Sequence, residues 1–555
     1  RPDAGSRFLP QAVSRALAAA PQLSDEQRTA VAAVTGPEAG GVCVLEAGAG
    51  TGKTVTANVI VASAQASGLK VVGVAPSWAA AEELAKSTNI ETFAIAKWRH
   101  DLEHGRIPPL DADTLLLCDE AGMVGTKDLA FVLSAVAAAP DGGARAILMG
   151  DRRQLAAVSG GSALRAVVDV LGRHATLTEV RRQDVSWQRA ASVLMARGDV
   201  EGGLRAYARH ERIELVGGDA PAQERVVALW TEARASHGDA EVLMVTRRNR
   251  DAASLNAAAR AVLRAEGVLT GAEVEVTARD RENKRVALAV AHGDRVRFGE
   301  GIQRHGIRNG TRATVTAVGS DGEGVVRLRV QLEDGRVIED AFSGFVRAPI
   351  PGAGRRETLP RITHAYAGTA YSVQGRTAAA CVYYGATASD ARELYVGLTR
   401  HRQVAWLVVE RDRLEATVRA QGSDPRGQPS TAELHERLFV EARRYAEKTN
   451  VVDHIEDRAT FVRCGSIPPN RPVVTLDLAR GLDAGRALRA VLQEIQGVPR
   501  LGLWHLSHLV RQTERVIAQR LVDLIEVLRR TPSSSLGHGS GRNRAADRSM
   551  PGHER

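Results

Sequence analysis

The eight residues AGAGTGKT, from Ala47 to Thr54, decide the fold of the first part of this 555-residue chain. They follow the apolar run Val42–Leu45 and precede the run Val55–Ile60, so they predict a strand, a glycine-rich loop and a helix. In such a loop, glycines let successive N–H groups point at one phosphate, the lysine contacts the β- and γ-phosphates, and the threonine hydroxyl holds Mg²⁺. The stretch predicts an ATP site made by Ala47, Gly48, Ala49, Gly50, Thr51, Gly52, Lys53 and Thr54.

The composition is that of an ordinary globular protein with an excess of positive charge. Hydrophobic residues make up 44% and charged residues 25%, and the net charge is +9, which favours a polyanionic partner. The cysteines lie far apart, at Cys43, Cys118, Cys381 and Cys464. This spacing predicts neither a disulfide framework nor a zinc site and fits the reducing bacterial cytoplasm. No run approaches 18 apolar residues, so no membrane span is expected.

Two regions alternate short apolar runs with helical patterns, which predicts an α/β fold with parallel sheets. The first covers residues 21–185, with strands expected at Val42–Leu45, Val71–Ala75, Leu115–Cys118 and Ala146–Met149. The second covers residues 241–412, with strands expected at Val242–Val245, Thr377–Tyr384 and Val404–Glu410.

The remaining regions have sequence patterns that do not predict parallel sheets. Within 290–350, alternating apolar and polar residues predict a small inserted antiparallel barrel with strands at Arg312–Val318, Val325–Leu332 and Arg336–Phe342. Residues 1–20 are expected to be a linker from a missing or upstream region, and 186–240 a helical connector. Residues 413–530 are expected to form a helical C-terminal region, and 531–555 a disordered tail.

Two further strand ends carry polar residues suited to ATP hydrolysis. Asp119 and Glu120 follow the apolar run Leu115–Cys118. There Asp119 would hold Mg²⁺ and Glu120 would orient and deprotonate the attacking water, although strand-end carboxylates also cap helices. Gln154, after the next apolar run, could touch the γ-phosphate, and the alternative for that segment is an ordinary turn.

Two arginines are candidates for stabilising the charge of phosphoryl transfer, as guanidinium groups do. Arg182 follows the first α/β region and Arg400 closes the second. Arginine carries nearly all the positive charge here, because lysine occurs only at 53, 70, 86, 97, 127, 284 and 448. Taken alone, either arginine is therefore more often a surface residue. Each becomes a candidate only through its place in the ordered set of motifs.

In this order the segments resemble the superfamily 1 helicases, most closely the RecD-like branch. By resemblance, Gln27 reads the adenine, and Pro76 and Ser77 contact single-stranded DNA. Gln374-Gly375, with Thr369 upstream, resembles the segment that couples DNA to the nucleotide. That segment usually has a lysine, a contact for DNA or phosphate, where this chain has Ser372.

A closer resemblance is to the conjugative relaxase-helicase family of the Ti-plasmid TraA kind, over roughly residues 20–412. It rests on the segments Asp119–Met123, Gly293–Arg295, Asn309–Thr311, His364–Thr369 and Tyr395–Arg402. The resemblance implies two RecA-like P-loop domains with an inserted SH3-like β-barrel. It also implies an ATP- and Mg²⁺-dependent helicase that moves 5′→3′ on the single-stranded plasmid transfer strand, with other conjugation proteins as possible partners.

Relaxases of this family nick DNA with a tyrosine beside a metal held by a His-x-His cluster. The first tyrosine here is Tyr207 and no His-x-His occurs, so no nicking domain is expected in this chain. Two other functions stay open: a stand-alone RecD-like repair helicase, and a non-hydrolysing remnant that binds single-stranded DNA. Lys53, Glu120, Arg182 and Arg400 argue against the remnant, and Ser372 argues mildly for it.

Two weaker patterns have plain alternatives. His100-Asp101-Leu102-Glu103-His104 fits the H-x-x-E-H pattern of some zinc peptidases, but no third ligand is placed and a solvated helix is the better interpretation. Trp78 and Trp98 could stack bases, and core packing or helix capping is an equal alternative for each.

Overall fold

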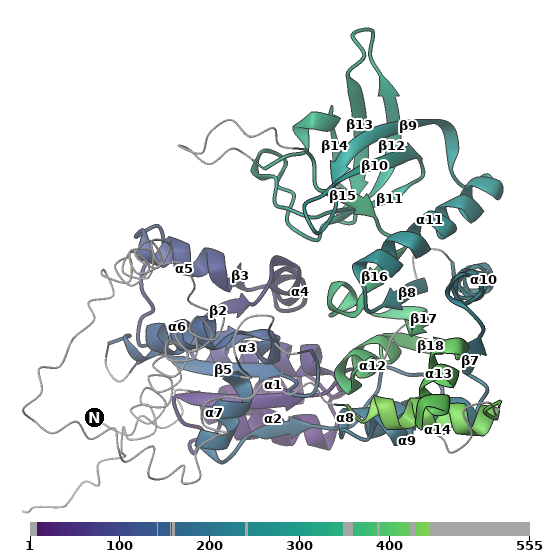
Figure 1. Cartoon of the computed structure of the whole chain (residues 1–555). Helices are drawn as coiled ribbons and strands as arrows, with labels where there is room; N and C mark the ends of the chain where they lie inside the picture. Colours follow the sequence, from purple (N-terminus) through teal and green to yellow (C-terminus); the bar gives the residue numbers. More distant parts are fainter. Residues whose placement is uncertain are drawn as a thin grey trace, which may run out of the picture.

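The structure is a computed structural model that describes residues 8–140, 143–155, 157, 161, 163–238, 242–347, 359–385, 389–421 and 428–444. In these residues the chain forms two lobes with parallel sheets and a separate antiparallel unit (Figure 1). The predicted disordered tail, and the predicted C-terminal helices beyond residue 444, lie outside the described residues.

The first lobe is a six-stranded parallel sheet in the order β3-β2-β4-β5-β1-β6. Its strands are β1 (Val42–Ala47), β2 (Lys70–Ala75), β3 (Glu91–Ala94), β4 (Thr114–Cys118), β5 (Arg145–Gly150) and β6 (Ala175–Leu177). The four predicted strands are confirmed. The edge strands β3 and β6 were not predicted, because four and three residues are too few to show a period.

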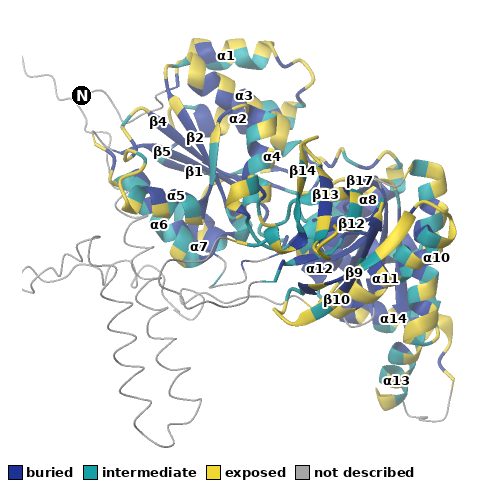
Figure 2. Ribbon diagram, turned by 90° about the horizontal axis from the view of Figure 1, so that it is seen from above, coloured by how far each residue is buried: buried dark blue, intermediate teal, exposed yellow. Residues whose placement is uncertain are grey.

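Helices cover both faces of this sheet, so its central strands are continuous apolar runs. The helices are α2 (Asp25–Thr35), α3 (Lys53–Ala66), α4 (Trp78–Thr88), α5 (Ile95–Glu103), α6 (Thr126–Ala137) and α7 (Ala163–Leu171). Alternate residues of β4 serve the two faces: Leu115 and Leu117 pack with α2 and α3, and Leu116 and Cys118 pack with α5, α6 and α7. The central strands are accordingly buried along their whole length (Figure 2).

The second lobe is a five-stranded parallel sheet in the order β16-β8-β17-β18-β7. Its strands are β7 (Ile213–Val216), β8 (Val242–Thr246), β16 (Ala367–Thr369), β17 (Ala378–Gly385) and β18 (His401–Glu410). Its helices include α8 (Ser186–Ala196), α9 (Val200–Arg209), α10 (Asp219–His237), α11 (Asn249–Ala265) and α12 (Ala391–Leu398). The range 186–240 is therefore not wholly helical as predicted. It contributes the edge strand β7, whose four residues between long helices were read as part of the connector.

The antiparallel unit lies between α11 and β16 and stands above the second lobe in Figure 1. Its sheet has the order β14-β13-β12-β11-β15, and a hairpin of β9 and β10 shares the same core. The strands are β9 (Thr270–Arg279), β10 (Arg285–His292), β11 (Arg295–Phe298), β12 (Arg312–Ser320), β13 (Val326–Leu332), β14 (Val337–Ala341) and β15 (Ile362–His364). The unit thus runs from Thr270 to His364 and is wider than the expected 290–350.

Short helices flank the two lobes. Within the expected linker 1–20, α1 (Pro10–Ala18) is a helix that packs on the first lobe through Val13, Ala16 and Leu17. After β18, α13 (Arg411–Gln421) and α14 (Thr431–Ala442) pack on the second lobe. Among the described helices, none combines the length and the apolar character needed to cross a bilayer.

Candidate nucleotide-binding site between the lobes

The loop Ala47–Thr54 joins β1 to α3, as the sequence predicts. Gly50 and Gly52 have φ values of +80° and +82°, which favour glycine. A Cβ at Gly50 would lie 2.5 Å from the Cβ of Arg182, and one at Gly52 would overlap the Gln27 amide. Both positions therefore require glycine for two reasons: the positive φ angle, and the lack of space beside Arg182 and Gln27.

Lys53 lies at the start of α3 and faces both predicted carboxylates. Its Nζ is 2.7 Å from Asp119 Oδ1 and 2.9 Å from Glu120 Oε1. Burial acts to lower the pKa of Lys53, but the two carboxylate charges outweigh it and raise the pKa. Lys53 is therefore a firmly charged ammonium group, paired with the two acidic side chains from the end of β4.

The two carboxylates have different environments. Burial raises the pKa of Asp119. Burial acts in the same direction on Glu120, but the charges of Lys53, Arg400 and Arg182 hold the pKa of Glu120 below its usual value. Glu120 also has φ +48°, a left-handed conformation that is uncommon outside glycine and occurs often at functional sites. Glu120 is therefore held ionised, which is the state that a general base needs.

Gln154 lies beside the end of β5 and touches the second lobe. Its Nε2 donates to Asp151 Oδ2 over 3.2 Å, and its Oε1 accepts a hydrogen bond of 3.4 Å from Gln374 Nε2. Gln374 follows a short helix after β16. The predicted nucleotide-sensing and DNA-coupling residues therefore meet across the lobe interface.

Tyr395 is a site residue that the sequence reasoning missed. It lies on α12 of the second lobe and is fully buried. Its hydroxyl accepts a hydrogen bond of 2.7 Å from the Ala49 N–H in the phosphate loop and donates one of 2.8 Å to Asp151 Oδ2. The available signal was its position five residues before Arg400, in a segment already singled out by resemblance.

The two predicted arginines come from opposite sides of the lobe interface, and the charges of both act on Glu120. Arg182 donates through Nη1 to the Thr399 carbonyl over 2.8 Å. Arg400 is buried, and its Nε donates to the Val396 carbonyl over 2.9 Å. Its Nη2 has no hydrogen-bond partner in the part of the chain that the structure describes. A buried, partly unsatisfied guanidinium group is suited to an anionic ligand.

Gln27 lies beside Gly52 of the loop, and Thr54 is the last residue of the loop. Gln27 is buried in the capping box of α2, where its Nε2 donates to the Thr51 carbonyl over 2.9 Å and its Oε1 accepts from the Ser24 N–H. Its amide therefore supports the phosphate loop. Thr54 is exposed in the first turn of α3, so its hydroxyl is accessible.

The predicted DNA-binding residues lie on both lobes. Pro76 and Ser77 precede α4, and Ser77 Oγ accepts a hydrogen bond of 3.2 Å from the Ala80 N–H. Thr369 ends β16 and is buried, whereas Gly375 is exposed with φ +82°. Ser372, at the place of the family's lysine, donates its hydroxyl to the Thr369 carbonyl over 2.8 Å and so caps the turn.

The alternatives for the weaker patterns are largely supported. His100 and His104 are exposed at the end of α5, and their rings are tilted by 40° with centroids 4.1 Å apart. Trp98 is a core residue packed edge-on against Phe131. Trp78 is half-buried beneath Arg308 of the antiparallel unit, whose guanidinium carbon lies 4.4 Å from the ring centre.

Comparison with known proteins gives matches over the same region. Residues 22–218 match the family model described as an AAA domain. The conjugal transfer protein TraA of Rhizobium radiobacter is 32% identical over 390 residues, which are 69% of this chain and 32% of TraA. The ATP-dependent RecD2 DNA helicase of Deinococcus radiodurans is 30% identical over 230 residues, which are 41% of this chain and 30% of RecD2. A solved structure of Pif1 helicases at forked double-stranded DNA aligns with 72% of this chain and 98% of its own, at 17% identity and a TM-score of 0.45.

The matches to TraA proteins recur in a second organism. The TraA protein of Agrobacterium fabrum is also 32% identical, over 388 residues. The chain spans about a third of the length of the TraA proteins that it matches. Over the aligned residues, the chain belongs to the TraA family of conjugal transfer proteins.

Proposed function

We propose that this chain is an ATP-dependent DNA motor, a superfamily 1 helicase or translocase that acts in conjugative DNA transfer. The observation that carries the proposal is the group of charges around Lys53. Asp119 and Glu120 lie within 3 Å of its ammonium group, and Arg400 brings a buried, partly unsatisfied guanidinium from the second lobe. A triphosphate inserted there would meet one cation from each lobe.

Each of these residues has a separate role in ATP hydrolysis. Lys53 and the N–H groups of the loop bind the phosphates. Glu120, held ionised by its cationic neighbours, orients the attacking water and takes its proton. Gln154 detects the γ-phosphate, and Arg182 and Arg400 stabilise the charge that develops on the transferred group. Gln27 contributes to adenine binding while it supports the loop at Thr51.

The donor set formed by Thr54 and Asp119 fits Mg²⁺. The exposed hydroxyl of Thr54 and the carboxylate of Asp119 are oxygen ligands of the kind that Mg²⁺ takes in few numbers, with water and phosphate oxygens completing its shell. When bound, the ion supplies positive charge to the phosphate oxygens.

The polar contacts across the lobe interface support a coupling of hydrolysis to movement on DNA. Gln374 touches Gln154 and lies next to Gly375, near Thr369, while Pro76 and Ser77 lie on the other lobe. We infer that these residues contact single-stranded DNA, the plasmid transfer strand, and that the lobes close and open around ATP. The 5′→3′ direction and an SH3-like identity of the inserted unit are part of the same proposal and rest on the family resemblance.

The test is single-stranded-DNA-stimulated ATP hydrolysis by the wild type and by Lys53→Ala. The variant should lose ATP turnover, because the phosphates lose their main cation, and keep its binding of an oligothymidine. Lys70→Ala is a matched control, since Lys70 is an exposed lysine at the start of β2 in the same lobe. Undiminished stimulated hydrolysis in Lys53→Ala would refute the site. A wild type that binds DNA without hydrolysing ATP would favour the non-hydrolysing remnant instead.

A further inference from the structure

Four consecutive residues, Arg181–Asp184, connect the phosphate loop to the segment of the second lobe that carries Arg400. They lie between β6 of the first lobe and α8 of the second. The N–H of the first residue donates to the Gly50 carbonyl, and the N–H of the last donates to the Arg402 carbonyl, each over 2.8 Å. We call these four residues the bridge segment. The loop that would hold the phosphates and the arginine that would meet them are therefore tied to one short stretch of chain.

Gln183 is the fully buried residue of the bridge segment. Its side-chain Nε2 donates to the Thr399 carbonyl over 3.4 Å and to the His401 carbonyl over 3.1 Å. An amide NH₂ group carries two protons, so it can serve both acceptors at once. Because these carbonyls come directly before and after Arg400, one side chain fixes the backbone on both sides of the arginine.

Burying this amide has a cost. The Oε1 of Gln183 is buried and has no hydrogen-bond partner in the described part of the chain. An unsatisfied buried acceptor is unfavourable, and an apolar side chain of the same size would avoid it. The two hydrogen bonds of Nε2 are therefore a reason for a glutamine at this position that packing alone does not supply.

A neutral donor suits the surroundings of Arg400. Arg182 donates to the same Thr399 carbonyl over 2.8 Å. Burial lowers the pKa of Arg182 to about 9, and the charge of Arg400 acts in the same direction, so the two guanidinium groups repel each other. A third cation at position 183 would add to this repulsion, and a carboxylate could not donate to the carbonyls. An amide donates without adding charge.

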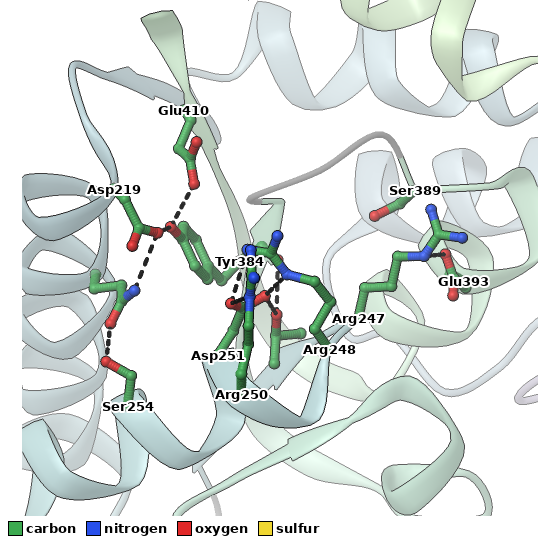
Figure 3. Close-up of polar contacts among 12 residues, drawn as sticks. Asp219, Arg247, Arg248, Arg250, Asp251, Ser254, Tyr384, Ser389, Glu393 and Glu410 are labelled. Carbon is green, nitrogen blue, oxygen red and sulfur yellow. Dashed lines mark hydrogen bonds and ion pairs between the residues drawn. The ribbon is translucent and has the colours of Figure 1, made fainter. Parts of the chain in front are cut away.

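Other arginines of the second lobe are held by carboxylates instead. Figure 3 shows the carboxyl ends of the strands in the second sheet, where Arg248 is paired with Asp251 over 2.6 Å. Arg400 donates from Nε to a neutral carbonyl, that of Val396, and the carbonyls on its two sides are held by Gln183. A guanidinium group held in this way keeps its charge available for an anionic ligand.

We propose that Gln183 is a positioning residue for Arg400, which holds the backbone of that arginine so that its guanidinium group meets the γ-phosphate of ATP. The role matters most when Arg182 turns from the Thr399 carbonyl to the phosphate, because Gln183 then keeps that carbonyl bonded. This inference rests on the proposed motor function, because Arg400 acts on the phosphate only if ATP is hydrolysed at this site.

The test is the steady-state kinetics of single-stranded-DNA-stimulated ATP hydrolysis by Gln183→Met, which keeps the length of the side chain and removes the donor. A misplaced catalytic group weakens the transition state more than the ground state. The kcat should therefore fall by about tenfold to a hundredfold, while the KM for ATP stays within about twofold. Gln188→Met is the matched control and should keep the wild-type kcat, since Gln188 is a buried glutamine on α8 whose Oε1 also has no hydrogen-bond partner among the described residues. A raised KM with unchanged kcat, or a kcat equal to that of the control, would overturn the inference.

A second measurement separates positioning from a general structural role. Gln183→Met is combined with Arg400→Ala, and single-turnover experiments resolve the slow hydrolysis of these variants. If Gln183 acts through Arg400, the double variant should hydrolyse ATP at the rate of Arg400→Ala within about twofold, because the arginine to be positioned is gone. An equal fold loss from Gln183→Met with and without Arg400 would show a structural role and would overturn the inference.

Gln183→Glu takes the place of the methionine variant if melting curves show that Gln183→Met does not fold. Its side chain keeps the size of glutamine but offers an ionised carboxylate that cannot donate, so its kcat should fall as well, and a wild-type kcat would contradict the inference. The two proposals fail in different ways. A wild type that hydrolyses no ATP refutes the motor and the positioning role together. A wild type that hydrolyses ATP no faster than Gln183→Met refutes the positioning role alone.

Discussion

The hydroxyl of Tyr395 joins the second lobe to the phosphate loop, so its removal in Tyr395→Phe tests how the lobes are held together. The substitution keeps the ring and its packing and deletes one oxygen atom. In the wild type that oxygen accepts from the Ala49 N–H and donates to Asp151, over 2.7 and 2.8 Å. Both partners are buried, so water cannot easily replace the hydroxyl.

The loss in free energy of unfolding is the sum of the effects on the two hydrogen-bond partners, Asp151 and Ala49. Asp151 keeps the Arg153 N–H and the Gln154 amide as donors, so its loss is close to that of one ordinary hydrogen bond, about 1 kcal/mol. The Ala49 N–H is left without this acceptor in a buried position, which costs about 1–3 kcal/mol. Tyr395→Phe should therefore lower the free energy of unfolding by about 2–4 kcal/mol.

The assay is urea denaturation together with hydrogen exchange at the phosphate loop. Tyr383→Phe is the matched control, because Tyr383 is equally buried and its hydroxyl forms a hydrogen bond with Ser389 within the second lobe. The control should lose about 1 kcal/mol and leave exchange at Ala49 unchanged. Exchange of the Ala49 amide should rise at least about tenfold in Tyr395→Phe, the equivalent of 1.4 kcal/mol. Wild-type exchange in that variant, or a stability no lower than that of Tyr383→Phe, would refute the reasoning.

Two further predictions concern single titratable groups. Glu120→Gln should bind ATP but turn it over at least about a hundredfold more slowly, since an amide cannot take the proton of water. Nucleotide retention measures the binding, and steady-state hydrolysis measures the turnover. Wild-type turnover in the variant would exclude Glu120 as the base. Burial lowers the pKa of His401 to about 3, against 6.5 for an exposed histidine. The unfolded chain therefore takes up a proton that the folded chain does not, and stability present above pH 6.5 is lost as the pH falls towards 3. Between pH 6.5 and 4 this amounts to about 3 kcal/mol. Denaturation curves of the wild type and His401→Gln should diverge by that amount, and parallel pH dependence would contradict the assignment.

The sequence predicted those elements whose pattern is long and uninterrupted. The strands β1, β2, β4 and β5 are buried on both faces and therefore read as continuous apolar runs. Strand β7 was missed because four residues between helices carry no usable period. Strand β9 is exposed along most of its length, so its first half lacks the apolar alternation that marks a strand.

The candidate site was predictable to the extent that it consists of strand-end motifs. Lys53, Asp119 and Glu120 follow apolar runs, and parallel strands bring their carboxyl ends to one edge of the sheet. Tyr395 could not be found this way, because an aromatic residue in an apolar helix is read as core. Its contact with Ala49 also joins residues 346 positions apart. Periodicity cannot report a contact that only the docking of two lobes creates.

The contacts across the lobe interface suggest how nucleotide charge could control closure. Lys53 is paired with both Asp119 and Glu120, while Arg400 keeps a buried nitrogen that has no hydrogen-bond partner among the described residues. A γ-phosphate would give Arg400 that partner and would compete with the carboxylates for Lys53, which frees Asp119 for Mg²⁺ and Glu120 for water. The same phosphate would lie near Gln154, whose amide already touches Gln374 on the other lobe. Binding of ATP and the position of the predicted DNA-coupling segment would therefore depend on one set of charges, which is what a motor driven by hydrolysis requires.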